Sequence, residues 1–170
     1  MTPLHAAAVH LPLALAMVLP LVSLGVLFAM WRNVLPHAAW SVVFGLQILL
    51  AISGLVAMNT GEDEEERVEH VVPHEALEEH EEWGQRFARF NLLVAALGLL
   101  PLVAFRRRPK LRAAAYGVTT LGMLASAALG LETGKEGGEL VYVHGAAEAY
   151  REPGSAPGKP GEAPHNDEAH

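Results

Sequence analysis

Two clusters of opposite charge, separated by long apolar runs, most constrain what this chain can fold into. The acidic cluster lies between Thr60 and Trp83 and holds eleven carboxylates. The basic cluster, between Arg106 and Arg112, holds four arginines and one lysine. An apolar run of about 20 residues is long enough to cross the hydrocarbon core of a bilayer as a helix. We therefore expect the chain to cross a membrane between the two clusters.

Composition narrows the chemistry that this chain can perform. Of its 170 residues 51% are hydrophobic, and none is a cysteine. Without cysteine the chain has no disulfide, no thiolate metal site and no covalently attached c-type haem. The formal net charge of -7 arises from the acidic cluster and disfavours binding to nucleic acid.

The apolar pattern predicts an all-α integral membrane protein, a bundle of four antiparallel helices. The expected spans are about 4–31, 37–59, 87–105 and 113–131, with an acidic loop and helix extension over 60–86. Residues 1–150 are expected to form this transmembrane domain. Residues 151–170 have no apolar periodicity and are predicted to be a disordered tail.

The Lys/Arg bias of the short loops predicts the orientation of the chain in the membrane. Arg32 and the basic cluster are expected on the cytoplasmic face. The acidic loop, the tail and both termini are then extracytoplasmic, and most of the histidines lie on that side.

Histidines at the outer ends of the predicted helices are the candidate ligands. At about 1.5 Å per residue, His5 and His80 both stand about 9 to 10 Å outside the lipid boundary and could face one another, whereas His10 lies lower. Neutral imidazoles there could hold a b-type haem or a divalent metal ion. The alternative, left open by the sequence, is that each histidine only satisfies a hydrogen bond to a glutamate or a carbonyl.

Small and polar residues within the spans are expected to serve helix packing. Gly130, Gly134 and Gly138 recur every four residues, so on a continuous helix they form a ridge that lets a neighbouring backbone approach. The alternative is a turn just outside the lipid. Gln47 and Asn91 are expected to be interhelical hydrogen-bond partners.

No pattern of catalytic residues favours an enzyme. His74-Glu75 has Glu78 where a zinc-binding helix of a metalloprotease needs a second histidine. The serines in the apolar helices have no Gly-x-Ser-x-Gly context. We therefore assign no catalytic residue.

Three motifs in order resemble a family of bacterial multi-pass membrane proteins of unknown function. The segment from His5 to Pro12 is similar to that family's His-Pro-x-x-Val-His-Phe-Pro opening, with Ala6 in place of the first proline. The later similarities are Thr60-Gly61 with the glutamate run ending at Val68-Glu69, then His80, then the segment from Gly137 to Gly145. The resemblance covers about residues 4–147. It implies His10, His80 and His144 as functional positions. Because relatives occur fused to cytochrome-like modules, it also implies a role near membrane electron transfer.

These observations lead to two hypotheses of function. In the first, outer-face histidines (His10, His80 and His144, with His5 as an alternative) hold a b-type haem or a metal ion for electron transfer or sensing. In the second, the chain is a non-catalytic structural or partner-binding membrane subunit. The expected partners are the lipid bilayer and a redox or membrane protein.

Overall fold

Four long helices make up most of the structure. The computed structural model describes residues 4–150, and this part of the chain is helical, without strands. The long helices are α2 (His10–Trp31), α3 (Trp40–Val68), α4 (His74–Leu99) and α5 (Pro109–Tyr142). Short helical turns flank them: α1 (Leu4–Ala8), η1 (His37–Ala39) and η2 (Ala146–Tyr150). The all-α prediction is thus confirmed, and the predicted tail, 151–170, lies outside the described residues.

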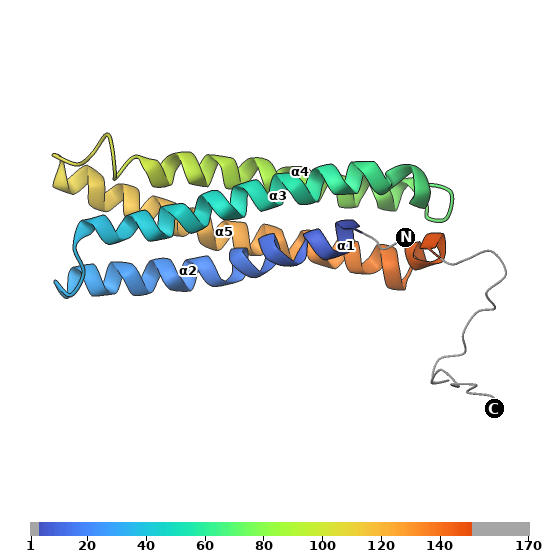
Figure 1. The fold of residues 1–170 in the computed structure, drawn as a ribbon, viewed down its shortest axis with the longest axis horizontal. Coiled ribbons are helices and arrows are strands. Elements are labelled where there is room, and N and C mark those ends of the chain that lie inside the picture. The colour runs from blue at the N-terminus through green and yellow to red at the C-terminus, as the bar shows by residue number, and fades with distance from the viewer. Residues whose placement is uncertain (1–3, 151–170) are drawn as a thin grey trace, which may run out of the picture.

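The long helices lie side by side along the molecule (Figure 1). Helix α2 packs on α3 and α5, and α4 packs on the same two helices. The α2–α3 and α4–α5 turns lie at one end, which we call the basic end because it carries Arg32 and the basic cluster. The α3–α4 turn, α1 and η2 lie toward the other, the acidic end (Figure 1).

Within the described residues, three helical stretches are long and apolar enough to cross a membrane. They are Leu4–Trp31, His37–Val68 and Pro109–Tyr142. Helix α4 is not among them, because its first half carries charges of the acidic cluster. Its apolar half is also shorter than the expected span 87–105.

Helix α4 ends at Leu99, and the prediction that it continues to Phe105 is wrong. Pro101 has no N–H to donate to the Leu97 carbonyl, and its ring opposes a further helical turn. Its side chain is fully buried, and residues 100–108 form turns instead. The start of α4 directly after Pro73 agrees with the sequence analysis.

Two helices run further than their apolar stretches. The second span was expected over 37–59, but helix α3 continues to Val68 through the glutamate run. Glutamate is a good helix former, and one internal glycine costs only about 1 kcal/mol. Helix α5 continues past the expected end at 131 and includes Gly134 and Gly138.

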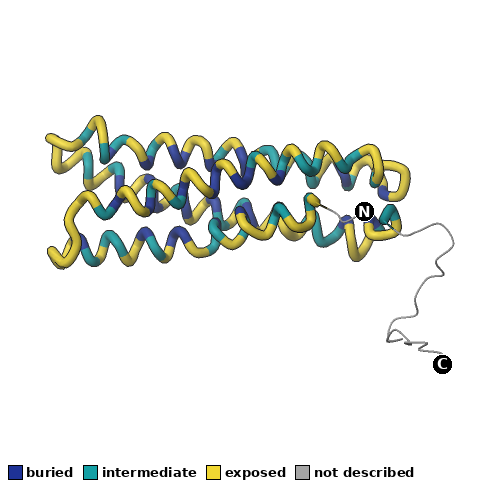
Figure 2. The backbone as a smooth tube through the Cα atoms, in the orientation of Figure 1, coloured by how far each residue is buried: buried dark blue, intermediate teal, exposed yellow. Residues whose placement is uncertain are grey.

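The interior is apolar, with tight contacts between helices. Trp40 and Leu19 are buried in one cluster with Met123, and Trp40 Nε1 donates to the Gly98 carbonyl at 3.0 Å. Large apolar side chains also cover the outside, where Leu21 is 69% exposed. Buried positions line the inner side of the helices and exposed ones the outer side (Figure 2). An outward apolar surface is what a lipid solvent requires.

Phe87 of α4 bridges two glycines on neighbouring helices. A Cβ added to Gly54 of α3 would lie 3.7 Å from Phe87 Cε1, and one added to Gly130 of α5 would lie 3.2 Å from Phe87 Cε2. The ring is only 4% exposed. It therefore fills space that the two glycines leave open.

A layer of polar side chains is also buried between the helices. Gln47 Nε2 donates to the Asn91 side-chain oxygen at 3.1 Å, and Ser126 Oγ donates to the same oxygen at 2.7 Å. All three residues are 0% exposed. The expectation that Gln47 and Asn91 join helices is confirmed, and Ser126 makes α5 the third helix of this network.

Candidate functional site

The structure brings two of the four candidate histidines together. His5 on α1 and His80 on α4 face each other with ring centroids 6.0 Å apart and an interplanar angle of 80°. This agrees with the similar heights worked out from the sequence. His10, the first residue of α2, is exposed, and His144 follows the end of α5 and is half-buried.

His5 is held by the backbone of α3. Its Nδ1 lies 2.8 Å from the Ala57 carbonyl oxygen and 3.4 Å from Thr60 Oγ1. A carbonyl can only accept, so Nδ1 carries the proton and Nε2 has the free lone pair. A Cβ on Gly61 would lie 3.2 Å from His5 Cε1, so the ring packs closely on α3.

His80 is packed just as closely against α5. Its Nδ1 is buried and has no hydrogen-bond partner among the described residues. A Cβ on Gly137 would lie 3.0 Å from His80 Cε1.

The surroundings keep His80 neutral. Burial lowers the pKa of His80 below its ordinary value of 6.5, and the facing His5 lowers it further. Glu136 and the Thr133 backbone act in the opposite direction without reversing the shift. At neutral pH the ring is therefore an uncharged imidazole, the form that binds metals.

Glu64 on the α3 extension fixes both ends of the described chain. Its Oε1 accepts hydrogen bonds from the backbone N–H groups of Leu4 (2.7 Å) and His5 (3.3 Å). These are first-turn donors of α1, which a carboxylate satisfies well. Its Oε2 accepts a hydrogen bond from the Tyr150 hydroxyl of η2. Nothing in the sequence separates Glu64 from the other glutamates of its run, so the sequence analysis did not single it out.

The glycine ridge on α5 faces α2 over only part of its length. A Cβ on Gly130 would lie 3.5 Å from Leu13, and one on Gly134 would lie 3.8 Å from the same side chain. No atom lies within 4 Å of the corresponding position on Gly138. Gly130 and Gly134 also line a shallow apolar hollow between α2 and α5, beside Met17.

The donor set at the acidic end is small. Among residues 4–150 no group of three or more His, Asp or Glu side chains is arranged to hold a metal ion. Two facing imidazoles, those of His5 and His80, are the candidate ligands that the structure brings together there. Comparisons with family models, with curated proteins and with solved structures found no match for this chain.

Proposed function

We propose that this chain is a multi-pass protein of the bacterial inner membrane that binds a metal centre between His5 and His80 for electron transfer. In this proposal α4 and the turns after it complete a fourth crossing. The Lys/Arg bias supports an orientation with the basic end in the cytoplasm and the histidine pair outside.

One observation carries the proposal: the rings of His5 and His80 face each other with centroids 6.0 Å apart, and His5 Nδ1 is bonded to a main-chain carbonyl. Such a bond fixes the tautomer and raises the basicity of the other nitrogen, as is typical of metal-binding histidines. The buried Nδ1 of His80 has no hydrogen-bond partner among the described residues. A buried polar atom left unpaired costs free energy, which a bound metal would offset.

The number of ligands favours a b-type haem over a bare ion. A structural ion such as zinc takes four protein ligands, whereas a haem would need only one or two side chains from the protein to hold it. A pair of histidines from α1 and α4 fits the second case. When bound, the haem would supply a one-electron centre.

The chain's own residues would hold and orient the two ligands. Glu64 anchors α1 on α3, which fixes the backbone of His5. Gly61 and Gly137 let the two rings lie against backbone, which restricts their rotation. The lowered pKa of His80 keeps its nitrogen available below pH 7.

The test is to purify the full chain in detergent and record visible spectra, oxidised and reduced, together with elemental analysis. The wild type should bind haem or metal, and His5→Ala and His80→Ala should each lose it. His74→Ala is the matched control, because His74 begins the same helix and is exposed, with Glu78 as its ion-pair partner at 3.2 Å. A colourless, metal-free protein that gains no absorbance with haemin would contradict the proposal and favour a structural or partner-binding subunit.

A further inference from the structure

The basic end of the molecule carries positive charge without any carboxylate to balance it. No Asp or Glu occurs between Leu4 and Gly61 or between Trp83 and Leu131. The turns at this end therefore consist of neutral residues and cations. The cations are Arg32, Arg106, Arg107, Arg108, Lys110 and Arg112.

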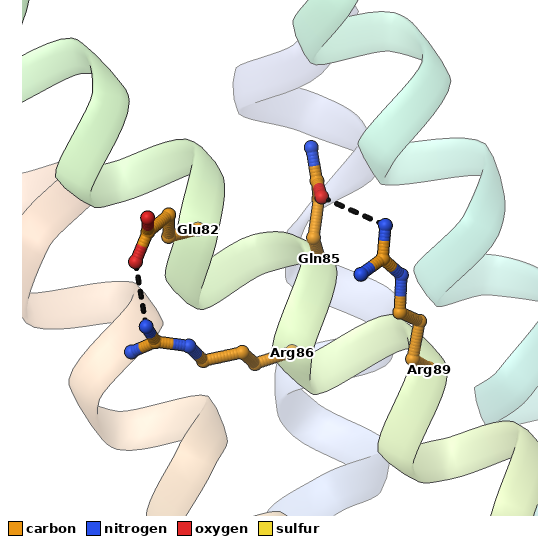
Figure 3. Close-up of polar contacts among 4 residues, drawn as sticks. All are labelled: Glu82, Gln85, Arg86 and Arg89. Atoms are coloured by element: carbon orange, nitrogen blue, oxygen red, sulfur yellow. Dashed lines mark hydrogen bonds and ion pairs between the residues drawn. The ribbon is translucent and has the colours of Figure 1, made fainter.

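Arginines toward the acidic end are different, because they have partners along their own helix. Arg86 donates to Glu82 at 2.6 Å and Arg89 donates to Gln85 at 3.0 Å (Figure 3). No ion pair of the described residues involves Arg106, Arg107 or Arg108. The counter-charge for these three guanidinium groups has to come from outside the described chain.

The turn after α4 holds this arginine run in a defined shape. The backbone N–H of Arg108 donates to the Phe105 carbonyl at 3.0 Å, and Arg112 Nη1 donates to the Arg106 carbonyl at 3.2 Å. Helix α5 then begins at Pro109. The three arginines line a surface hollow of about 590 Å³.

The other wall of the hollow is apolar. Val103 and Ala104 line it together with the arginines, and Val103 is 62% exposed. The hollow lies directly before a helix that is apolar enough to cross a membrane. An exposed valine beside arginines, next to the end of a helix that could cross the membrane, is what the boundary between acyl chains and lipid headgroups favours.

We propose that this hollow binds the phosphate of an anionic membrane lipid. The guanidinium groups of Arg106, Arg107 and Arg108 would donate to phosphate oxygens, for which their planar fork is well suited. Val103 and Ala104 would lie against the apolar part of the lipid. Binding needs the membrane location but no metal at His5 and His80, so the metal-free protein serves for the test.

The test measures lipid binding to the detergent-purified full chain by native mass spectrometry. The probes are phosphatidylglycerol, which is anionic, and phosphatidylcholine, which is zwitterionic. A basic side chain near an anionic surface contributes about fivefold to binding, so Arg106→Gln/Arg107→Gln/Arg108→Gln should weaken phosphatidylglycerol binding by on the order of a hundredfold. The variant with lysine at all three positions should bind phosphatidylglycerol with intermediate strength. Lysine keeps the positive charge but lacks the planar guanidinium group that can donate two hydrogen bonds to one phosphate.

A charge-matched control removes three cations that have partners: Arg86→Gln/Arg89→Gln/Lys135→Gln, with helix content checked by circular dichroism. This control should bind phosphatidylglycerol like the wild type. Equal binding of both lipids by the wild type, or equal phosphatidylglycerol binding by the wild type and the Gln triple variant, would overturn the proposal. Displacement of the lipid by inorganic phosphate at equal concentration would identify a free anion as the ligand and overturn the lipid assignment.

Discussion

Replacing Asn91 with Ala should remove the centre of the buried polar layer. The Asn91 side-chain oxygen accepts from Gln47 at 3.1 Å and from Ser126 at 2.7 Å, so two interhelical hydrogen bonds are lost at once. Such bonds in membrane proteins average about 0.6 kcal/mol, with a maximum near 1.7. The free energy of unfolding should therefore fall by about 1 to 3 kcal/mol, and the lost side-chain volume adds to this.

A double-mutant cycle separates the free energy of the shared hydrogen-bond acceptor from the effect of simply removing side-chain atoms. Ser126→Ala alone should cost about 0.6 to 1.7 kcal/mol. In the Asn91→Ala background it should cost little, because its acceptor is already absent. The assay is unfolding in mixed micelles with increasing sodium dodecyl sulfate, followed by circular dichroism.

Ser41→Ala is the control for this experiment. Ser41 is exposed and donates only to the Ala38 carbonyl three residues earlier, at 2.8 Å. Ser41→Ala should change the free energy of unfolding by no more than about 0.5 kcal/mol. Strictly additive effects of Asn91→Ala and Ser126→Ala would refute the shared-acceptor explanation.

Three further predictions concern the acidic end. Gly137→Ala places a Cβ 3.0 Å from the His80 ring and should shift that ring's NMR signals, whereas Gly138→Ala, which meets no atom within 4 Å, should not. Because the pKa of His80 is lowered in the fold, the unfolded state binds its proton first as pH falls. The contribution of His80 to stability should therefore be full above pH 6.5 and decline as pH falls toward the lowered pKa. A pH series of unfolding curves should show this decline, and His80→Gln should reduce it. Burial and the bond to Glu64 raise the pKa of Tyr150 to about 12, so this hydrogen bond persists up to strongly alkaline pH. Tyr150→Phe should lower the local stability of η2 by about 1 kcal/mol and speed amide hydrogen exchange there. Unchanged exchange would contradict this role of Tyr150.

The main elements of the fold were predictable because charge and apolar length are local properties. The turn near Asn33, which has a positive φ of 58°, and the start of α4 after Pro73 follow directly from residue types. The end of α4 was missed although Pro101 gives a clear signal in the sequence. Helix α3 continues past Gly61 because glutamate is a good helix former and one internal glycine costs little, so the glutamate run itself carried the signal for this extension.

The level of the candidate histidines along the helices could be predicted from the sequence, but the residues that contact them could not. Counting residues placed His5 level with His80, and the rings do face each other. The same counting could not tell that His10 is exposed or that Glu64 bonds to both α1 and η2. Which side of a helix meets its neighbour depends on rotation about the helix axis, and a uniform glutamate run carries no signal of that rotation.

The contact of Phe87 with two glycines has a consequence for evolution. A methyl group at position 130 would compete with the ring for space, and one at 54 would contact it. Homologues that gain a side chain at Gly130 should therefore carry a smaller residue at 87. These positions belong to three different helices, so their covariation in a future alignment would record the packing of α3, α4 and α5 around a single aromatic ring.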